Sequence, residues 1–206
     1  AHCICGGSVN AGDHTAHTDV SYTAWNGTSS ISYVKMEYWM LHKPAGYVTS
    51  ADDPGGPSVL ELIPERFRRF GVMPVGRLDK ATEGLLLFTN DGVLAHKLIS
   101  PRFGVWKRYY AEHEGTAGEA DIAAFAAGLT LGDGTKCLPA RLTPLGAGKS
   151  CVEIQEGKYH QVRRMLASRG MPVTYLRRDA EGTLGLDGLE KGAVRELPLS
   201  SLESLI

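Results

Sequence analysis

The chain has 206 residues, of which 43% are hydrophobic and 22% are charged. This composition is typical of a folded globular protein and argues against disorder. Lysine and arginine together number 22, and aspartate and glutamate number 23, so the net charge is −1. That balance excludes a polycationic tail, although it allows a basic patch on part of the surface.

The longest apolar run falls well short of the ~18 residues that a membrane-spanning helix needs, and no charged-then-apolar leader opens the chain. The cysteines are too few and too scattered for a disulfide framework in a chain of this size. They are Cys3, Cys5, Cys137 and Cys151. We therefore expect a protein of the reducing cytoplasm that is not associated with a membrane.

Residues 1–33 differ from the rest because they are rich in Gly, Ser, Thr, His and Asp and poor in large aliphatic side chains. Within them, Asn26-Gly27 is a typical hairpin turn. Cys3 and Cys5 lack a second paired set of ligands at the spacing of a structural zinc site, so we expect no metal. The stretch is too short to bury a core of its own, and we divide the chain into residues 1–33 and 34–206.

Short apolar runs and turns follow one another through the larger part. Residues 38–41 predict a strand that stops at a Pro/Gly turn. Ser58 is expected to cap a short helix. Residues 85–88 are apolar on both faces, which predicts a central strand, and Asp91 is expected to cap the helix that follows it.

Apolar residues at strand spacing and at helix spacing also occur toward the end of the chain. Further strands are predicted at residues 106–110, 151–155 and 173–176, with a hairpin turn at Asp133-Gly134 and a closing hairpin over residues 184–197. Helices are predicted at residues 121–129 and 162–166. Strands outnumber helices and many adjoin by turns. We therefore expect an α+β domain built on a mixed, largely antiparallel sheet.

The most informative segment is GRLDKATEGLLLFTNDG, at residues 76–92. It places a charged loop directly before the apolar strand. Arg77 and Asp79 are two residues apart, so an extended backbone would put both side chains on one side, with the carboxylate beside a cation. Such a setting keeps a carboxylate ionised and directed into a cleft. The alternative is that Asp79 only caps a turn and that Arg77 is solvated.

A second segment concentrates positive charge in a chain that is neutral overall. Residues 155–178 contain one acidic residue, Glu156. The basic residues of this range are Lys158, Arg163, Arg164, Arg169, Arg177 and Arg178. This asymmetry is expected of a surface that binds a phosphate backbone. A solvated basic helix face is the alternative.

Aromatic side chains are interleaved with these charges and could stack on exposed bases. They are Tyr47, Trp106, Tyr109, Tyr110, Tyr159 and Tyr175. The alternative is that they belong to the strand core. No glycine-rich dinucleotide or phosphate-binding loop and no nucleophile elbow is present, so neither a nucleotide cofactor nor hydrolysis is supported.

Four motifs occur in order along the chain, namely Lys43-Pro44-Ala45-Gly46-Tyr47, GRLDKATEGLLLFTNDG, Lys107-Arg108-Tyr109 and EGKYHQVRRM. They closely resemble the RNA pseudouridine synthases, in the branch that modifies a single uridine in ribosomal RNA. The D-D-P-G-G-P-S-V-L loop and the V-T-Y-L-R stretch look most like the enzymes that act on 16S rRNA. The resemblance implies the pseudouridine synthase catalytic fold for residues 34–206. Residues 1–33 then resemble a truncated remnant of the family's S-four-type RNA-binding module, with its linker.

The resemblance also implies a catalytic set. Asp79 matches the family's essential aspartate, Tyr109 matches the tyrosine that stacks on the target base, and Arg163 matches the basic residue that pairs with the aspartate. Arg164 is an alternative for that role, because two adjacent arginines leave the register open by one residue. We expect the pairing to fix the carboxylate and keep it ionised.

Further residues of the matched motifs are expected to contact the substrate RNA. Arg77 matches the arginine that fills the gap left in the RNA stack, and Leu176 matches an apolar residue that lines the pocket. The other expected RNA contacts are Lys43, Lys107, Tyr159, His160, Gln161, Arg164 and Arg177.

The implied function is the conversion of a specific uridine of ribosomal RNA, expected in 16S rRNA, to pseudouridine. Uracil is detached from the ribose, rotated and rejoined through C5 without redox change, so no cofactor is expected. The carboxylate either attacks covalently or takes a sugar proton, and the sequence leaves both routes open. The expected partner is ribosomal RNA, and the protein is expected to be a monomer. The alternatives are a synthase for large-subunit rRNA or tRNA, and a non-catalytic rRNA-binding assembly factor.

Overall fold

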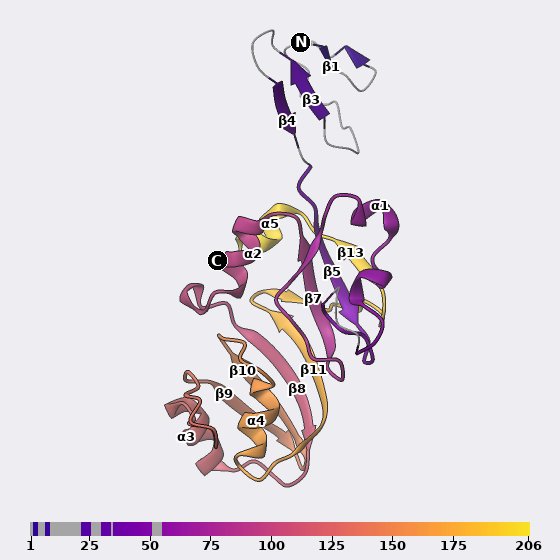
Figure 1. Ribbon diagram of the computed structural model, residues 1–206. Helices are drawn as coiled ribbons and strands as arrows, with labels where there is room; N and C mark the ends of the chain where they lie inside the picture. Colours follow the sequence, from indigo (N-terminus) through magenta and orange to yellow (C-terminus); the bar gives the residue numbers. More distant parts are fainter. Residues whose placement is uncertain (1, 4–6, 9–21, 26–29, 34, 51–54) are drawn as a thin grey trace.

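The computed structural model describes residues 2–3, 7–8, 22–25, 30–33, 35–50 and 55–206. A nine-stranded sheet forms the body of the protein, and its main path runs in the order β13-β5-β7-β11-β8-β10-β9 (Figure 1). Its strands are β5 (Tyr38–Lys43), β6 (Met73–Val75), β7 (Glu83–Thr89), β8 (Lys107–His113), β9 (Arg141–Gly146), β10 (Lys149–Ile154), β11 (Val173–Glu181), β12 (Leu184–Gly185) and β13 (Val194–Glu196).

The sheet is mixed, as the sequence predicts. The pairing between β7 and β11 is parallel, and the other pairings of this sheet are antiparallel. The parallel pair joins the strand that follows the GRLDKATEG loop to the strand that contains Leu176. Two segments that lie far apart in the sequence are thereby fixed side by side at the centre of the sheet.

β7 is central because its side chains are buried on both faces. Leu86 and Phe88 belong to one apolar core with Trp39. Leu85 and Leu87 belong to a second core on the other face. Burying both faces of a strand places it in the middle of a sheet, so the predicted central strand is confirmed, and the loop before it has a rigid base.

The helices are short. They are η1 (Val59–Leu62), α1 (Glu65–Arg68), α2 (Gly92–Ile99), η2 (Pro101–Phe103), α3 (Glu119–Ala127), α4 (Gln161–Ala167) and α5 (Leu199–Glu203). Ser58 and Glu61 form a capping box at η1, and the Asp91 carboxylate accepts a hydrogen bond from the backbone of α2, so both predicted caps are confirmed. None of the helices in the described part of the chain is long and apolar enough to span a bilayer.

α4 packs its buried side chains, among them Val162 and Met165, onto the core beneath it. Its N-terminus follows a loop at residues 155–160. The position of this helix therefore brings the EGKYHQVRRM motif next to strands β8 and β10, opposite the loop that carries Asp79.

Two sequence predictions are wrong in detail. The expected closing hairpin does not form, because β12 pairs with β11 whereas β13 pairs with β5. Between them, Gly192 donates a backbone hydrogen bond to His42 of β5 and draws the chain to that edge. The turn at Asp133-Gly134 joins an isolated bridge between Thr130 and Lys136 and not two strands. A backbone hydrogen bond from Leu131 to Thr135 also closes it.

The beginning of the chain forms a second sheet of four strands in the order β2-β1-β3-β4. Its strands are β1 (His2–Cys3), β2 (Gly7–Ser8), β3 (Tyr22–Trp25) and β4 (Ser30–Tyr33). β3 and β4 pair antiparallel, whereas the predicted Asn26-Gly27 turn between them lies outside the described residues. The division of the chain at residue 34 stays a prediction.

Candidate active site

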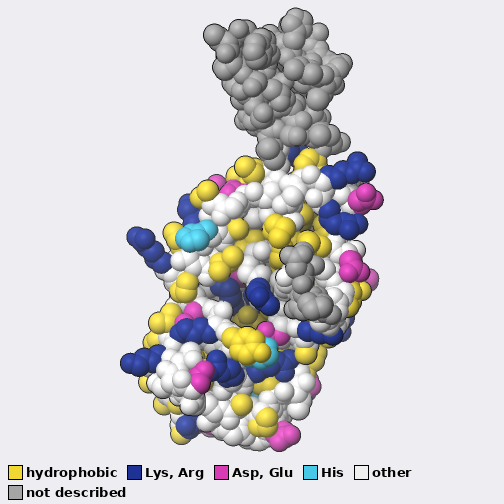
Figure 2. Space-filling model, in the orientation of Figure 1, with side chains coloured by type: hydrophobic (Ala, Val, Ile, Leu, Met, Phe, Trp, Pro, Cys, Tyr) yellow, Lys and Arg dark blue, Asp and Glu magenta, His cyan; other side chains and the backbone are white. Residues whose placement is uncertain are grey.

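A pocket of about 580 Å³ opens between the loop before β7 and the loop before α4. Figure 2 shows a hollow near the centre of this face, with Lys and Arg side chains around it. Seven of the predicted site residues line the pocket: Arg77, Asp79, Tyr109, Tyr159, His160, Gln161 and Leu176. Residues from four separate segments of the sequence therefore meet here.

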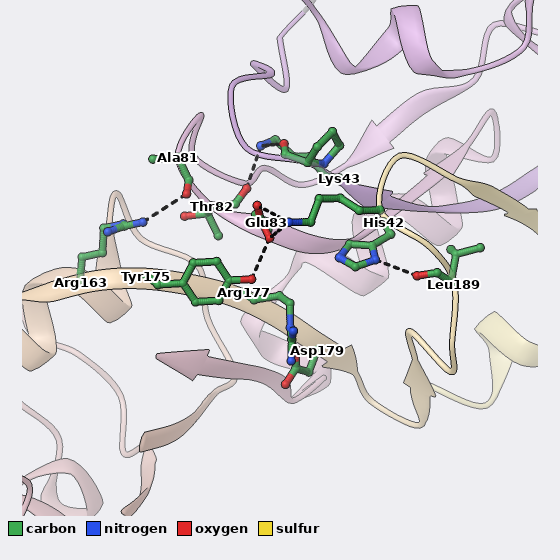
Figure 3. Close-up of polar contacts among 12 residues, drawn as sticks. His42, Lys43, Ala81, Thr82, Glu83, Arg163, Tyr175, Arg177, Asp179 and Leu189 are labelled. Carbon is green, nitrogen blue, oxygen red and sulfur yellow. Dashed lines mark hydrogen bonds and ion pairs between the residues drawn. The ribbon is translucent and has the colours of Figure 1, made fainter. Parts of the chain in front are cut away.

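The Asp79 loop is organised by a buried lysine. The Lys43 ammonium, at the end of β5, donates to the backbone oxygens of Asp79 (3.2 Å) and Lys80 (3.3 Å). It donates to that of Thr82 at 2.8 Å (Figure 3). It also donates to the oxygen of the adjacent Pro44, at 3.0 Å. Burial lowers the pKa of Lys43 from 10.5 to about 8, although the Asp79 carboxylate acts to raise it. The ammonium thus fixes the loop from behind, and it leaves the Asp79 side chain facing the pocket.

Thr49 holds the other end of the same loop. Its hydroxyl donates to the backbone oxygen of Leu78 at 2.7 Å and accepts from the Leu78 N–H at 3.2 Å. The Asp79 carboxylate remains about one-third exposed. A backbone held on both sides of the carboxylate gives that group a defined direction, which a catalytic position requires.

Tyr109 and Leu176 form the apolar part of the pocket wall. Both side chains are buried, and they come from the neighbouring strands β8 and β11. Burial raises the pKa of the Tyr109 hydroxyl, while the guanidinium of Arg178 acts in the opposite direction. The ring therefore presents a neutral hydroxyl at neutral pH.

Glu156 organises the loop on the opposite side of the pocket. Its carboxylate accepts hydrogen bonds from the Leu138 backbone (2.8 Å) and the Gln161 side chain (2.7 Å). Burial acts to raise the pKa of Glu156, but these bonds and the Lys158 ammonium bring it below its usual value. The Gln161 oxygen in turn accepts from the Lys158 backbone. The Gln161 amide is thus occupied within the protein.

His160 brings this loop to the carboxylate. Its Nε2 lies 3.5 Å from Asp79 Oδ1. The backbone of His160 is left-handed, with φ 47°, which is uncommon for a residue other than glycine. Its ring stacks on Tyr159 with centroids 3.9 Å apart and planes inclined by 16°. The exposed Tyr159 ring therefore stands at the mouth of the pocket.

Neither predicted arginine pairs with Asp79 in this structure. Arg163 donates weak hydrogen bonds to the backbone oxygens of Ala81 (3.5 Å) and Val173 (3.4 Å). Arg164 pairs with Asp133 at 2.6 Å. Arg163 extends toward the loop at Ala81 (Figure 3), so its guanidinium contacts the backbone two residues beyond Asp79.

Three further predicted RNA contacts are placed elsewhere. The ammonium groups of Lys43 and Lys107 are buried, and that of Lys107 lies 3.7 Å from Glu181. Arg177 pairs with Asp179 (Figure 3) and lies over the Tyr110 ring, away from the residues that line the pocket. This placement argues against direct RNA contacts by the two lysines, and it removes Arg177 from the pocket.

The basic cluster at residues 155–178 also carries less net positive charge than the number of its basic residues suggests. Carboxylates lie within 4 Å of five of its members: Lys158 pairs with Glu156, Arg164 with Asp133, Arg169 with Asp121, Arg177 with Asp179 and Arg178 with Glu181. Within the described part of the chain, Arg163 is the member with no carboxylate at that distance. The partners come from distant segments, so a count within the motif does not include them.

A sequence model of the family described as RNA pseudouridylate synthase matches residues 37–168. The chain belongs to this family. The matched range contains the Asp79 loop, Tyr109 and the loop that carries His160. The sequence resemblance to the RNA pseudouridine synthases is therefore confirmed, and the chain is an RNA pseudouridine synthase, an isomerase.

Several relatives of this pseudouridine synthase are similar over most of their length. An uncharacterised RNA pseudouridine synthase of Bacillus subtilis (strain 168) is 37% identical over 85% of this chain and 75% of its own. The ribosomal small subunit pseudouridine synthase A of Pseudomonas aeruginosa is 41% identical over 78% of this chain and 70% of its own. The protein of the same name from Escherichia coli (strain K12) is 36% identical over 89% and 80%.

The fold agrees with that of a solved pseudouridylate synthase. Its crystal structure superposes with a TM-score of 0.77 and 33% sequence identity, over 90% of this chain and 77% of that chain. The mixed sheet with few helices is therefore the catalytic fold of pseudouridine synthases.

Some lining residues of this pseudouridine synthase were not singled out in the sequence as site residues. Thr49, Lys80 and Thr82 line the pocket. Thr82 and Lys80 follow Asp79 within the same motif, so their proximity could have been inferred. Thr49 carries no such signal, because its role depends on a contact with Leu78 that only the folded chain makes.

Proposed function

We propose that this pseudouridine synthase isomerises a uridine of small-subunit ribosomal RNA, with Asp79 as the catalytic carboxylate. The observation that carries the proposal is the position of Asp79, a partly exposed carboxylate on a fixed loop at the wall of the pocket of about 580 Å³. The small-subunit substrate is supported by two relatives that bear that name and are 36% and 41% identical.

The reaction breaks the bond between N1 of uracil and C1′ of ribose and forms a bond between C5 and C1′. A proton leaves C5 and N1 gains one, so substrate and product are isomers. Asp79 either attacks the sugar or takes its 2′ proton, and each route needs an ionised carboxylate beside the ribose. The surrounding pocket must retain the detached uracil until it is rejoined.

The target uridine has to leave its stack to enter this pocket. Unstacking costs a few kcal/mol, and stacking on Tyr109 recovers roughly 1–3 kcal/mol. Arg77 lines the pocket and is exposed, which supports its assignment to the gap left in the RNA stack. Tyr159 and His160 form an aromatic pair at the pocket mouth, which suits contact with unpaired bases.

Arg163 remains our choice for the basic partner of Asp79 in the RNA-bound state. Its guanidinium contacts the backbone at Ala81, two residues beyond Asp79, and no carboxylate of the described residues neutralises it. Lys43 and Lys107 are assigned to support the site, because their ammonium groups are already bound inside the protein.

We assign residues 1–33 to a separate unit, a remnant of an S-four-type RNA-binding module, and residues 34–206 to the catalytic domain. A reaction on ribosomal RNA places the protein in the cytoplasm, where ribosomes are assembled. We propose that it acts as a monomer.

The substrate can be identified by mapping pseudouridine in rRNA from a strain that lacks the gene. We expect one site of the small-subunit rRNA to lose its modification, and complementation with the wild-type gene to restore it. Purified protein should then modify an unmodified transcript of that rRNA at the same uridine. Loss of a site in large-subunit rRNA or tRNA instead would overturn the proposed substrate.

A further inference from the structure

Three charged side chains are buried beside the Tyr109 wall of the pocket. They are Lys107, Arg178 and Glu181, with relative exposures of 7%, 2% and 1%. The Glu181 carboxylate lies 3.7 Å from the Lys107 ammonium and 3.6 Å from the Arg178 guanidinium. Two cations share one anion, so this buried cluster retains one positive charge. Burying such a charge is costly unless it has a partner.

The Arg178 guanidinium is held tightly on one side. Its Nε donates to the backbone oxygen of Leu85 at 2.8 Å. Its Nη2, by contrast, is buried and lies 3.6 Å from Glu181 Oε2, beyond hydrogen-bond distance, and the guanidinium also interacts with the Tyr109 side chain. A buried donor with a poorly placed acceptor costs up to about 1–3 kcal/mol, so the long contact of Nη2 with Glu181 calls for an explanation.

The positive charge of Arg178 influences the neighbouring hydroxyl of Tyr109. Arg178 and Tyr109 are directly opposite each other in the antiparallel pairing of β11 with β8. Residues opposite each other in a sheet project from the same face. Burial raises the pKa of Tyr109, and the Arg178 guanidinium is the main influence that lowers it.

We propose that Arg178 is a positioning residue of the reaction, which orients the Tyr109 hydroxyl toward the target base and offsets negative charge that develops there. Glu181 and the backbone oxygen of Leu85 hold the guanidinium in this position. The inference rests on the proposed function, since it requires Tyr109 to face the base. It adds a residue that does not line the pocket itself.

A double-mutant cycle tests the proposal. Single-turnover rates are measured for the wild type, Arg178→Met, Tyr109→Phe and the double variant, on the rRNA transcript that the wild type modifies. Arg178→Met leaves the Lys107–Glu181 pair balanced in charge, so we expect it to fold. We expect about a tenfold loss of rate for Arg178→Met, with RNA affinity unchanged, and almost no further loss in the Tyr109→Phe background.

A spectroscopic readout separates this role from a structural one. The ¹³Cζ resonance of Tyr109, assigned by its absence in Tyr109→Phe, should shift in Arg178→Met and return toward its original position in Arg178→Lys. The control is Arg195→Met, an arginine on β13 that donates to the Asp187 backbone and does not line the pocket. That variant should leave the resonance and the rate unchanged.

Equal losses for Arg178→Met in both backgrounds, or an unmoved Tyr109 resonance, would overturn the inference and indicate a purely structural arginine. Failure of the proposed function has a different signature. In that case, the wild type would not modify the small-subunit transcript, or Asp79→Asn would remain active whatever residue occupies position 178.

Discussion

The imidazole Nε2 of His160 lies 3.5 Å from Oδ1 of Asp79, and among the described residues it is the one basic side chain within 4 Å of that carboxylate. The contact depends on the left-handed backbone of His160. Strained backbone of this kind is often found at functional sites. The first residue of the HQVRR motif, and not one of its arginines, therefore meets the carboxylate.

Replacing the imidazole should have a modest effect. The side chain of His160 is 39% exposed and that of Asp79 is 33% exposed. Solvent therefore screens the interaction, which is worth at most about 1 kcal/mol. We therefore expect His160→Ala to reduce the single-turnover rate by about fivefold or less. His160→Asn is the matched variant, because asparagine tolerates the left-handed backbone while lacking the ring. A thousandfold loss in both variants would contradict an orienting role and make His160 essential to the chemistry.

Lys43 predicts a pH dependence of stability. Its pKa in the folded protein is about 8, below its ordinary 10.5, mainly because it is buried. Between these two values the unfolded chain binds more protons than the folded chain, so rising pH favours the folded state. Raising the pH from 7.5 to 9.5 should stabilise the wild type by about 2 kcal/mol through this residue.

Urea unfolding of the wild type and Lys43→Met at both pH values isolates that contribution, because other titrating groups are common to the two proteins. The wild type should gain stability relative to the variant as the pH rises. If the two proteins respond to pH in parallel, the Lys43 ammonium does not carry the linkage.

The backbones of β7 and β11 approach so closely at Gly84 that we expect no larger residue to fit there. A Cβ atom at this position would lie 2.2 Å from the backbone oxygen of Arg178, and its φ is +115°. We expect Gly84→Ala to lower the free energy of unfolding by about 3 kcal/mol or more, because backbone atoms cannot move aside. Gly92→Ala is the control, since nothing lies within 4 Å of its Cβ position. Thermal unfolding should separate the two variants clearly, and equal melting temperatures would show that the strands can part.

Arg163 and Arg164 can be separated by substitution. Arg163 has no carboxylate partner in the described residues and reaches the Asp79 loop at Ala81, whereas Arg164 pairs with Asp133. We expect Arg163→Met to reduce the single-turnover rate by at least about tenfold, with a smaller loss for Arg164→Met. The reverse order would assign the role of basic partner to Arg164.

Local features of the fold were predictable from the sequence. The caps at Ser58 and Asp91 depend on side chains within three residues of the backbone they bind. The central strand at residues 85–88 is indicated by apolar residues on both of its faces. The strand partners of β12 and β13 were not predictable from the sequence. They are decided by the distant strands β11 and β5 and by the hydrogen bond from Gly192 to His42.

The site was predictable to a similar extent. The motifs place Asp79, Tyr109 and His160 correctly at one pocket. The motifs also contain Lys43 and Lys107, but a sequence does not show the backbone oxygens or the carboxylate that bind their ammonium groups inside the fold. Long-range pairs of this kind follow from the tertiary structure alone.

The Asp79→Asn variant tests the central claim most directly. The amide keeps the size and polarity of the side chain but can neither attack as a carboxylate nor accept the sugar proton efficiently. On the rRNA transcript that the wild type modifies, we expect no pseudouridine from Asp79→Asn and RNA affinity close to that of the wild type. Turnover by Asp79→Asn at a substantial fraction of the wild-type rate would contradict the account.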